Sequence, residues 1–121
     1  MELLEAVGKP SFRAVFDFAN FVQAGVTAVA EAYERLEPWV TAFHLKDARA
    51  ADGVVFPAGE GDGEVARILG RATVSGKDYP MTIEPHLAGN PALSSLSGED
   101  RFGVAVGALR KVLGDAGARW D

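Results

Sequence analysis

The sequence predicts an α/β protein built from about three strand–loop–helix units with parallel strands. Short apolar segments alternate along the chain with longer segments in which apolar residues recur at helical spacing. Charged residues appear abruptly where the apolar segments end. Strands connected through helices in this way lie parallel and are joined by right-handed crossovers. No linker divides residues 1–121, so the chain is expected to form one domain.

The N-terminal part of the chain supplies a helix end and the first unit. Residues 1–10 are expected to close a helix with its apolar residues on one face. Residues 13–18 are short, apolar and rich in phenylalanine, which is typical of a strand buried on both faces in a parallel sheet. The next helix is predicted over residues 27–37, where Thr27 is the expected N-cap and Pro38 ends the helix.

The second unit starts with a strand over residues 39–45. Its connection, residues 48–63, is predicted as a loop because it is rich in glycine, aspartate and proline. Asp62 is the expected N-cap of the following helix, whose apolar residues lie between positions 65 and 72. Gly76 is placed to end that helix in a left-handed conformation.

The third unit has a strand over residues 79–83 and the clearest helical pattern in the chain. Residues 102–113 place apolar side chains on one face of a helix. Ser97 is followed three residues later by an aspartate, a weak match to a capping box. Gly114 or Gly117 is expected to end the helix.

Charge and composition exclude several classes of function. The chain has 12 basic and 17 acidic residues, and its net charge of −5 repels a nucleic-acid backbone, so we expect no nucleic-acid partner. It has no cysteine, which excludes disulfides, thiolate metal ligands and a cysteine nucleophile. No apolar run is long enough for a membrane span and the N-terminus lacks a secretory pattern, so we expect a cytoplasmic protein with no membrane partner.

Three polar residues stand where predicted strands end: Asp17, His44 and Glu84. The carboxyl ends of parallel strands form the edge at which α/β proteins bind ligands. Carboxylate oxygens and an imidazole nitrogen suit a divalent cation such as Mn²⁺, Mg²⁺, Co²⁺ or Zn²⁺. Each residue alone has an ordinary structural explanation, as a loop-start acid, a core histidine or a surface acid. Their shared position favours a metal site.

Further polar residues flank this predicted site. Asn20 follows Asp17 by three positions and is a candidate substrate contact, although asparagine is also a common turn former. Lys46 is a candidate cation for an anionic substrate group, and Asp47 is a candidate acceptor that orients the histidine. His86 is a candidate substrate contact or a cap for the following loop.

A glycine-rich segment, residues 59–63, precedes a predicted helix. It superficially resembles a phosphate-binding loop, because amides at a helix N-terminus attract anions. Its two acids argue against phosphate, and it lacks the Lys-Ser/Thr pair of a nucleotide-binding loop. We interpret it chiefly as a turn that starts a helix.

Four segments, taken in order, resemble the C-terminal half of the xylose isomerase-like TIM-barrel superfamily, and more narrowly its sugar phosphate isomerase/epimerase branch. They are residues 16–20, 44–47, 57–62 and 83–86. The resemblance extends over about residues 1–113. It implies a (β/α)₈ barrel, typically of about 250 residues, of which this chain supplies the last three strands and their helices.

In that superfamily a divalent metal, often manganese, is held by two glutamates, an aspartate and a histidine at strand ends. Asp17, His44 and Glu84 match three of these ligands. The family's epimerases use the two glutamates as acid and base on opposite faces of a keto sugar, moving a proton at the carbon next to a metal-polarised carbonyl. The resemblance thus implies a metal-dependent sugar or sugar phosphate isomerase or epimerase, with a small carbohydrate substrate and Glu84 as a catalytic residue.

The chain departs from the family pattern at two places. It matches one of the two glutamates, so residues outside this chain are expected to complete the site, and Asn20 stands where a histidine is often found. A non-catalytic half-barrel that serves as an assembly or binding module is the alternative. Because a three-stranded parallel sheet leaves open edges, we expect a homo-oligomer or a separate N-terminal half-barrel as partner.

Overall fold

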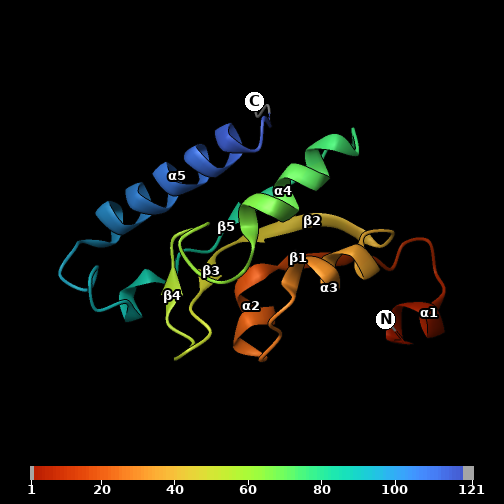
Figure 1. Cartoon of the computed structure of the whole chain (residues 1–121), viewed down its shortest axis with the longest axis horizontal. Coiled ribbons are helices and arrows are strands. Elements are labelled where there is room, and N and C mark those ends of the chain that lie inside the picture. The colour runs from red at the N-terminus through yellow and green to blue at the C-terminus, as the bar shows by residue number, and fades with distance from the viewer. Residues whose placement is uncertain (1, 119–121) are drawn as a thin grey trace.

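The computed structural model describes residues 2–118 as a mixed α/β fold (Figure 1). Its elements in chain order are α1 (Glu2–Val7), β1 (Ala14–Asp17), α2 (Phe18–Gln23), α3 (Val29–Leu36), β2 (Val40–Leu45), β3 (Asp47–Ala48), β4 (Val55–Phe56), α4 (Val65–Val74), β5 (Met81–Ile83), the 3₁₀ helix η1 (Leu87–Gly89) and α5 (Gly98–Asp115). Within these residues, no helix is long and apolar enough to cross a membrane.

Three strands form a parallel sheet in the order β1-β2-β5. In its register Asp17 pairs with His44, and His44 pairs with Thr82. The predicted set of three parallel strands is thereby confirmed, and each strand of this sheet lies within its predicted range. A closed barrel needs more strands than residues 2–118 contain, so the barrel itself remains a prediction.

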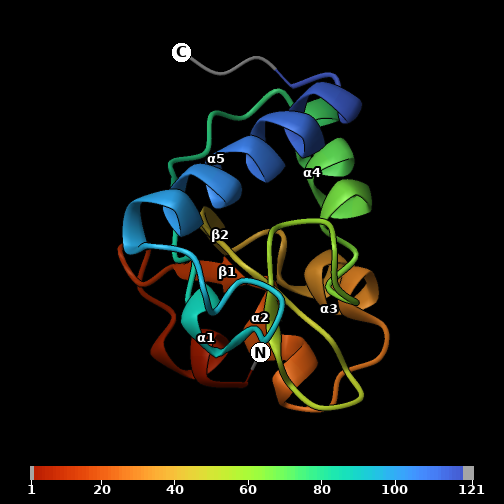
Figure 2. The same ribbon diagram turned by 90° about the vertical axis from the view of Figure 1, so that its left-hand side faces the viewer.

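One face of the sheet carries the hydrophobic core. Phe16 of β1 and Phe43 of β2 are register partners on this face, and both are fully buried. Tyr33 of α3 packs edge-on against Phe16, with ring centroids 5.3 Å apart. Ile68 of α4 and Leu109 of α5 join the same core, and the two helices lie side by side in both views (Figures 1 and 2). Burial of this apolar surface is the main term that stabilises the layer.

The opposite face of the sheet is more open. Because side chains alternate along a strand, Val15 and Ala42 share this face with Asp17, His44 and Thr82. The Val15 side chain, on the outer strand β1, is 51% exposed. The candidate metal ligands of β1 and β2 therefore stand on the face that the core helices leave uncovered.

Helix α2 is an element that the sequence analysis does not predict. It starts directly after β1, because the Asp17 carboxylate accepts a hydrogen bond from the Asn20 N–H at 3.0 Å and so caps the first turn. Its first residue, Phe18, stacks on Phe43 with ring centroids 5.7 Å apart. The apolar residues after Asp17, which resemble a continuation of the strand, therefore reach the core as part of a helix.

The predicted N-cap of α3 is wrong. The helix begins at Val29, so Ala28 rather than Thr27 occupies the cap position, and Ala28 offers no side-chain hydrogen bond. Instead the Glu64 carboxylate accepts the Ala30 N–H at 2.8 Å. A contact from a distant loop therefore satisfies an N–H group that a local hydroxyl was expected to cap.

The predicted N-cap of α4 is also wrong. Glu64 precedes the helix in a left-handed conformation, with φ +53°, and takes the cap position in place of Asp62. The Asp62 carboxylate accepts the Ala50 N–H at 2.7 Å instead. This bond ties the two ends of the long loop together, and inside that loop β3 and β4 form a short antiparallel ladder that the composition conceals.

The other helix ends agree with the sequence analysis. Ser97 is the N-cap of α5, because its hydroxyl oxygen accepts the Asp100 N–H at 3.0 Å. Gly76 and Gly117 follow the ends of α4 and α5 with φ +69° and +67°. Glycine has no Cβ to oppose this left-handed conformation, so both residues end their helices as predicted.

Candidate metal centre

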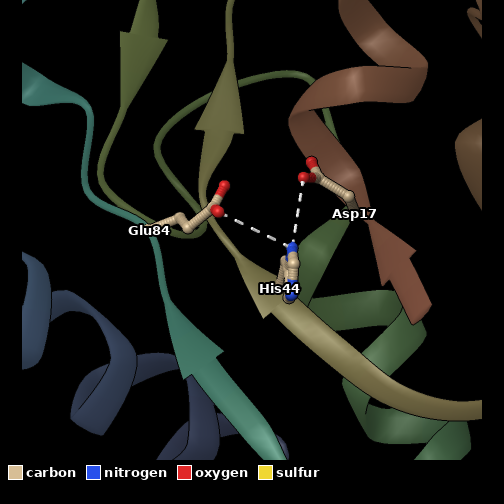
Figure 3. Close-up of side chains that lie close together, drawn as sticks. All are labelled: Asp17, His44 and Glu84. Atoms are coloured by element: carbon tan, nitrogen blue, oxygen red, sulfur yellow. Dashed lines mark ion pairs between the residues drawn. The ribbon is translucent and has the colours of Figure 1, made fainter.

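The strand ends bring Asp17, His44 and Glu84 together (Figure 3). Asp17 is the last residue of β1 and pairs with His44 in β2. Glu84 follows β5 directly, and its N–H donates to the Leu45 carbonyl oxygen at 3.3 Å, which extends the ladder beyond the strand. The side chains that were expected to converge at the carboxyl end of the sheet do so.

The three side chains direct one ligand atom each toward a common space. These atoms all lie within 4.8 Å of one another. His44 Nδ1 is 3.8 Å from Asp17 Oδ2 and 3.9 Å from Glu84 Oε1. A divalent cation that bonds nitrogen and oxygen at about 2.0–2.2 Å holds neighbouring ligands about 3–4 Å apart. The donor types and the two spacings around His44 therefore fit a divalent cation, whereas the set as a whole lies within 4.8 Å.

The candidate centre is buried on one side and open on the other. The Asp17 side chain is 9% exposed, whereas the His44 and Glu84 side chains are 37% and 38% exposed. Asp17 Oδ1 accepts the Asn20 N–H, which fixes the carboxylate and leaves Oδ2 facing the other two side chains. The His44 and Glu84 side chains are therefore accessible to solvent, and the Asp17 carboxylate is not.

Lys46 lies within this cluster instead of reaching into solvent. Its Nζ donates to Glu84 Oε2 at 2.8 Å and lies 3.1 Å from Asp17 Oδ2, and its side chain is 8% exposed. Burial disfavours the charged ammonium, but the hydrogen bonds and charges of the two carboxylates outweigh that effect and raise the pKa of Lys46. The residue predicted to meet an anionic substrate group is paired with both acids.

Glu84 is the most exposed of the ligand candidates, and the Lys46 ammonium stabilises its charge. The hydrogen bond from Lys46 and its charge lower the pKa of Glu84, burial opposes this shift, and His44 and His86 lower it further. Glu84 is therefore ionised at neutral pH. In that form it can bind a cation or accept a proton.

The two remaining predicted substrate contacts stand at the rim of the cluster. Asn20 is exposed, and its contact with Asp17 is made by the backbone N–H rather than by the side-chain amide. His86 is exposed and precedes η1 with φ +44°, without a capping hydrogen bond from its side chain. Contact of either side chain with a substrate stays a prediction.

Asp47 follows Lys46 directly but has a different environment. Its fully buried carboxylate accepts four backbone N–H groups at 2.8–3.1 Å, from Ala48, Gly59, Gly61 and Gly63. Burial raises the pKa of Asp47, and these amide hydrogen bonds act in the opposite direction. The expectation that Asp47 orients the histidine is wrong, because its hydrogen bonds go to the glycine loop.

Two glycines of that loop lie so close to Asp47 that no larger residue fits in their place. A Cβ on Gly61 would lie 2.5 Å from the Ala48 carbonyl oxygen and 2.7 Å from Asp47 Oδ1. A Cβ on Gly63 would lie 2.6 Å from the same Oδ1 atom. The loop does cradle an anion with its amides, but the anion is the chain's own carboxylate. The sequence pattern that could have predicted this contact is the acid Asp47 just after a strand, followed downstream by alternate glycines at 59, 61 and 63.

Comparisons with known proteins supply no relative for this site. No protein-family model, no curated protein and no solved structure matches the chain. The resemblance to the xylose isomerase-like superfamily stays a prediction, and a functional proposal has to start from the geometry of Asp17, His44, Lys46 and Glu84.

Proposed function

We propose that Asp17, His44 and Glu84 bind a divalent metal ion and that the chain is part of an isomerase or epimerase acting on a sugar or sugar phosphate. The observation that carries the proposal is one aspartate, one histidine and one glutamate from three parallel strand ends, with ligand atoms within 4.8 Å. The mixed oxygen and nitrogen set suits Mn²⁺, Mg²⁺, Co²⁺ or Zn²⁺, and Mn²⁺ is favoured because the superfamily that the sequence resembles often uses manganese.

Each ligand residue has a distinct proposed role. Asp17, held by the Asn20 N–H and largely buried, is the anchor of the set. His44 supplies the nitrogen ligand through Nδ1, the atom that faces both acids. When bound, the metal would polarise the substrate carbonyl and stabilise the negative charge that develops as the neighbouring carbon loses its proton.

Glu84 is the proposed catalytic base and acid. Its lowered pKa keeps the carboxylate ionised, and its 38% exposure puts it within reach of a substrate. It takes the proton from the carbon next to the carbonyl, and the C–H electron pair moves toward the carbonyl oxygen. Return of that proton to the former carbonyl carbon, together with transfer of the hydroxyl proton on the first carbon to the former carbonyl oxygen, completes an isomerisation. Asn20 and His86 are the proposed substrate contacts at the rim.

The proposal includes a larger assembly around this sheet. In it, β1, β2 and β5 are the last three strands of an eight-stranded barrel. Their parallel order and the candidate ligands at their carboxyl ends support this assignment. Epimerisation needs a second acid on the opposite face of the sugar. That acid and a further metal ligand are assigned to residues outside this chain.

Calorimetric titration with Mn²⁺ tests the metal site. We expect wild type to bind one ion per chain and His44→Ala to bind at least about tenfold more weakly, because it lacks a ligand. Thr82→Ala is the matched control, since Thr82 is the register neighbour of His44 in β5 and carries no ligand atom of the cluster. Equal weak binding by wild type and His44→Ala would contradict the site.

Hydrogen exchange into a sugar tests the proposed reaction. With Mn²⁺ in D₂O, wild type should introduce deuterium at the carbon next to the carbonyl of a ketose or ketose phosphate, as followed by proton NMR. Glu84→Gln should lose this exchange, because an amide cannot accept the proton. A wild-type chain that binds Mn²⁺ yet exchanges no deuterium into any ketose would exclude catalysis by this chain.

A non-catalytic assembly module is the second candidate, and exposed apolar surface favours it. Val15 on the outer strand β1 is 51% exposed, and Phe12 just before that strand is 37% exposed. β1 and β5 are the two edges of the described sheet, which a further copy of the chain can extend. Light scattering on the purified chain should then show an oligomer. A stable, compact monomer would contradict the assembly role.

A further inference from the structure

Lys46 points to a property of the metal site beyond its ligand set. The ammonium lies 3.1 Å from Asp17 Oδ2 and 2.8 Å from Glu84 Oε2, so the same two acids that would hold a divalent ion already hold a cation. We propose that Lys46 competes with the divalent cation for Asp17 and Glu84, and that metal binding displaces its ammonium from the cluster. This inference rests on the proposed metal site.

At Asp17 the two cations would use the same oxygen. Asp17 Oδ1 is engaged by the Asn20 N–H, which leaves Oδ2 as the oxygen for either cation. That Oδ2 atom is the one nearest to His44 Nδ1 at 3.8 Å and also the one paired with Lys46. At Glu84 the two cations would share the carboxylate but not the oxygen, because Oε1 faces His44 and Oε2 accepts Lys46.

Electrostatic repulsion separates the metal-bound and lysine-paired states. An ion bonded to Asp17 Oδ2 would stand about 3–5 Å from an ammonium that kept its present place, at a typical metal–oxygen bond length. Lys46 is 8% exposed, so solvent screens this repulsion poorly. In the metal-free chain the ammonium neutralises part of the charge of the two acids. When the metal binds, that neutralisation is no longer needed.

The backbone beside Lys46 is fixed, so the displacement falls on its side chain. Leu45 before it is buried in the core, and Asp47 after it is bound by four backbone amides. Lysine has a flexible four-carbon stem, and its ammonium can leave through rotation about side-chain bonds. The end of β2 and the ligand His44 stay in place during that change.

Removal of the lysine charge tests the competition. At one pH and ionic strength, Lys46→Met should bind Mn²⁺ about 10- to 100-fold more tightly than wild type, the range expected for loss of a competing charge-assisted hydrogen bond. Lys77→Met is the matched control, with the same charge change at an exposed position before β5, and it should retain the wild-type affinity. Equal affinities of Lys46→Met and wild type would overturn the inference.

Amine labelling of the wild-type chain provides a second readout that needs no substitution. An acetylating reagent followed by peptide mass spectrometry should modify Lys46 slowly without metal, and at least about fivefold faster with saturating Mn²⁺, because the released ammonium gains solvent exposure. Exposed Lys77 is the internal reference and should react at one rate throughout. A Lys46 rate that stays constant or falls on metal addition would overturn the inference, even if Lys46→Met fails to fold.

The outcomes separate this inference from the proposed function. Mn²⁺ binding by wild type with unchanged affinity in Lys46→Met leaves the metal site standing and rejects the competition. Binding by Lys46→Met that is tighter than in wild type and is lost in the double variant with His44→Ala supports both. Absence of Mn²⁺ binding in wild type and in Lys46→Met rejects the metal site, and the competition with it.

Discussion

Lys46 and Asp47 are neighbours in sequence, yet they belong to two contrasting carboxylate environments. Asp47 is enclosed by four backbone amides that occupy both of its oxygens. Asp17 and Glu84 share one ammonium, that of Lys46. Each also has a carboxylate oxygen that faces His44. The Asp47 carboxylate thus has hydrogen-bond donors for both of its oxygens. Asp17 and Glu84 together have more carboxylate oxygens than donors to satisfy them.

This difference distinguishes a structural acid from a binding site. A buried carboxylate that is surrounded by fixed amides has its charge compensated within the fold, so it stabilises the loop and needs no ligand. Two acids that share one flexible lysine can exchange that lysine for another cation. The comparison predicts that substitutions at Asp47 act on stability alone, whereas substitutions at Asp17 and Glu84 act on cation binding as well as on stability.

Loss of the Asp47 carboxylate should give the largest change in stability. We expect Asp47→Ala to lower the free energy of unfolding by about 3 kcal/mol or more, because buried amides of the glycine loop lose a charged acceptor. Urea denaturation measures this change. Asp62→Ala is the matched control, because exposed Asp62 accepts one N–H in the same loop, and it should cost about 1 kcal/mol or less. Equal losses in the two variants would remove the contrast.

A methyl group at Gly61 should give the next largest change. Its Cβ would lie 2.5 Å from the Ala48 carbonyl oxygen, so we expect Gly61→Ala to cost about 1–3 kcal/mol in urea unfolding. Gly70→Ala is the control within α4, where a Cβ meets nothing within 4 Å. That change should stabilise the chain by about 0.5–1 kcal/mol, the helix propensity difference. A tolerated Gly61→Ala would show that the loop does not fit tightly around Asp47.

Protonation of Glu84 should give the smallest change. Its folded pKa lies below the unfolded value near 4.5, so its ion pair stabilises the fold above that pH, and the contribution is lost as the pH falls through the folded pKa. With a chelator present, Glu84→Gln should be less stable than wild type at neutral pH by under about 1 kcal/mol, because the pair is partly exposed. The gap should narrow as the pH falls below 4.5 and through the folded pKa. A gap that is independent of pH would contradict this pairing.

Much of the fold follows from the sequence pattern, because the sheet strands are short apolar runs and the core helices are long enough to show their helical period. The parallel sheet and the helix that starts after Ser97 are examples. The start of α2 is hidden, since an apolar run after a strand has no helical signature until Asp17 is known to cap it. The cap of α3 is hidden for another reason: its acceptor, Glu64, comes from a distant segment.

The candidate site divides in the same way. The convergence of Asp17, His44 and Glu84 can be predicted because parallel strands end at one edge of a sheet. The partners of Lys46 cannot be read from the sequence, because they depend on the side-chain conformation of a residue just beyond a strand. Three of the four amides that bind Asp47 lie 12–16 residues away in the sequence. The alternate glycines allow the loop to fold back onto Asp47, but this contact cannot be predicted from them alone.

A crystal structure of the wild-type chain with Mn²⁺ tests the central claim most directly, because anomalous scattering locates the ion without assumptions about its ligands. We expect one peak at about 2.0–2.4 Å from Asp17 Oδ2, His44 Nδ1 and Glu84 Oε1. We also expect Lys46 Nζ to have left hydrogen-bond distance of Asp17. An ion bound elsewhere, or a lysine still paired with both acids and no ion between them, would contradict the account.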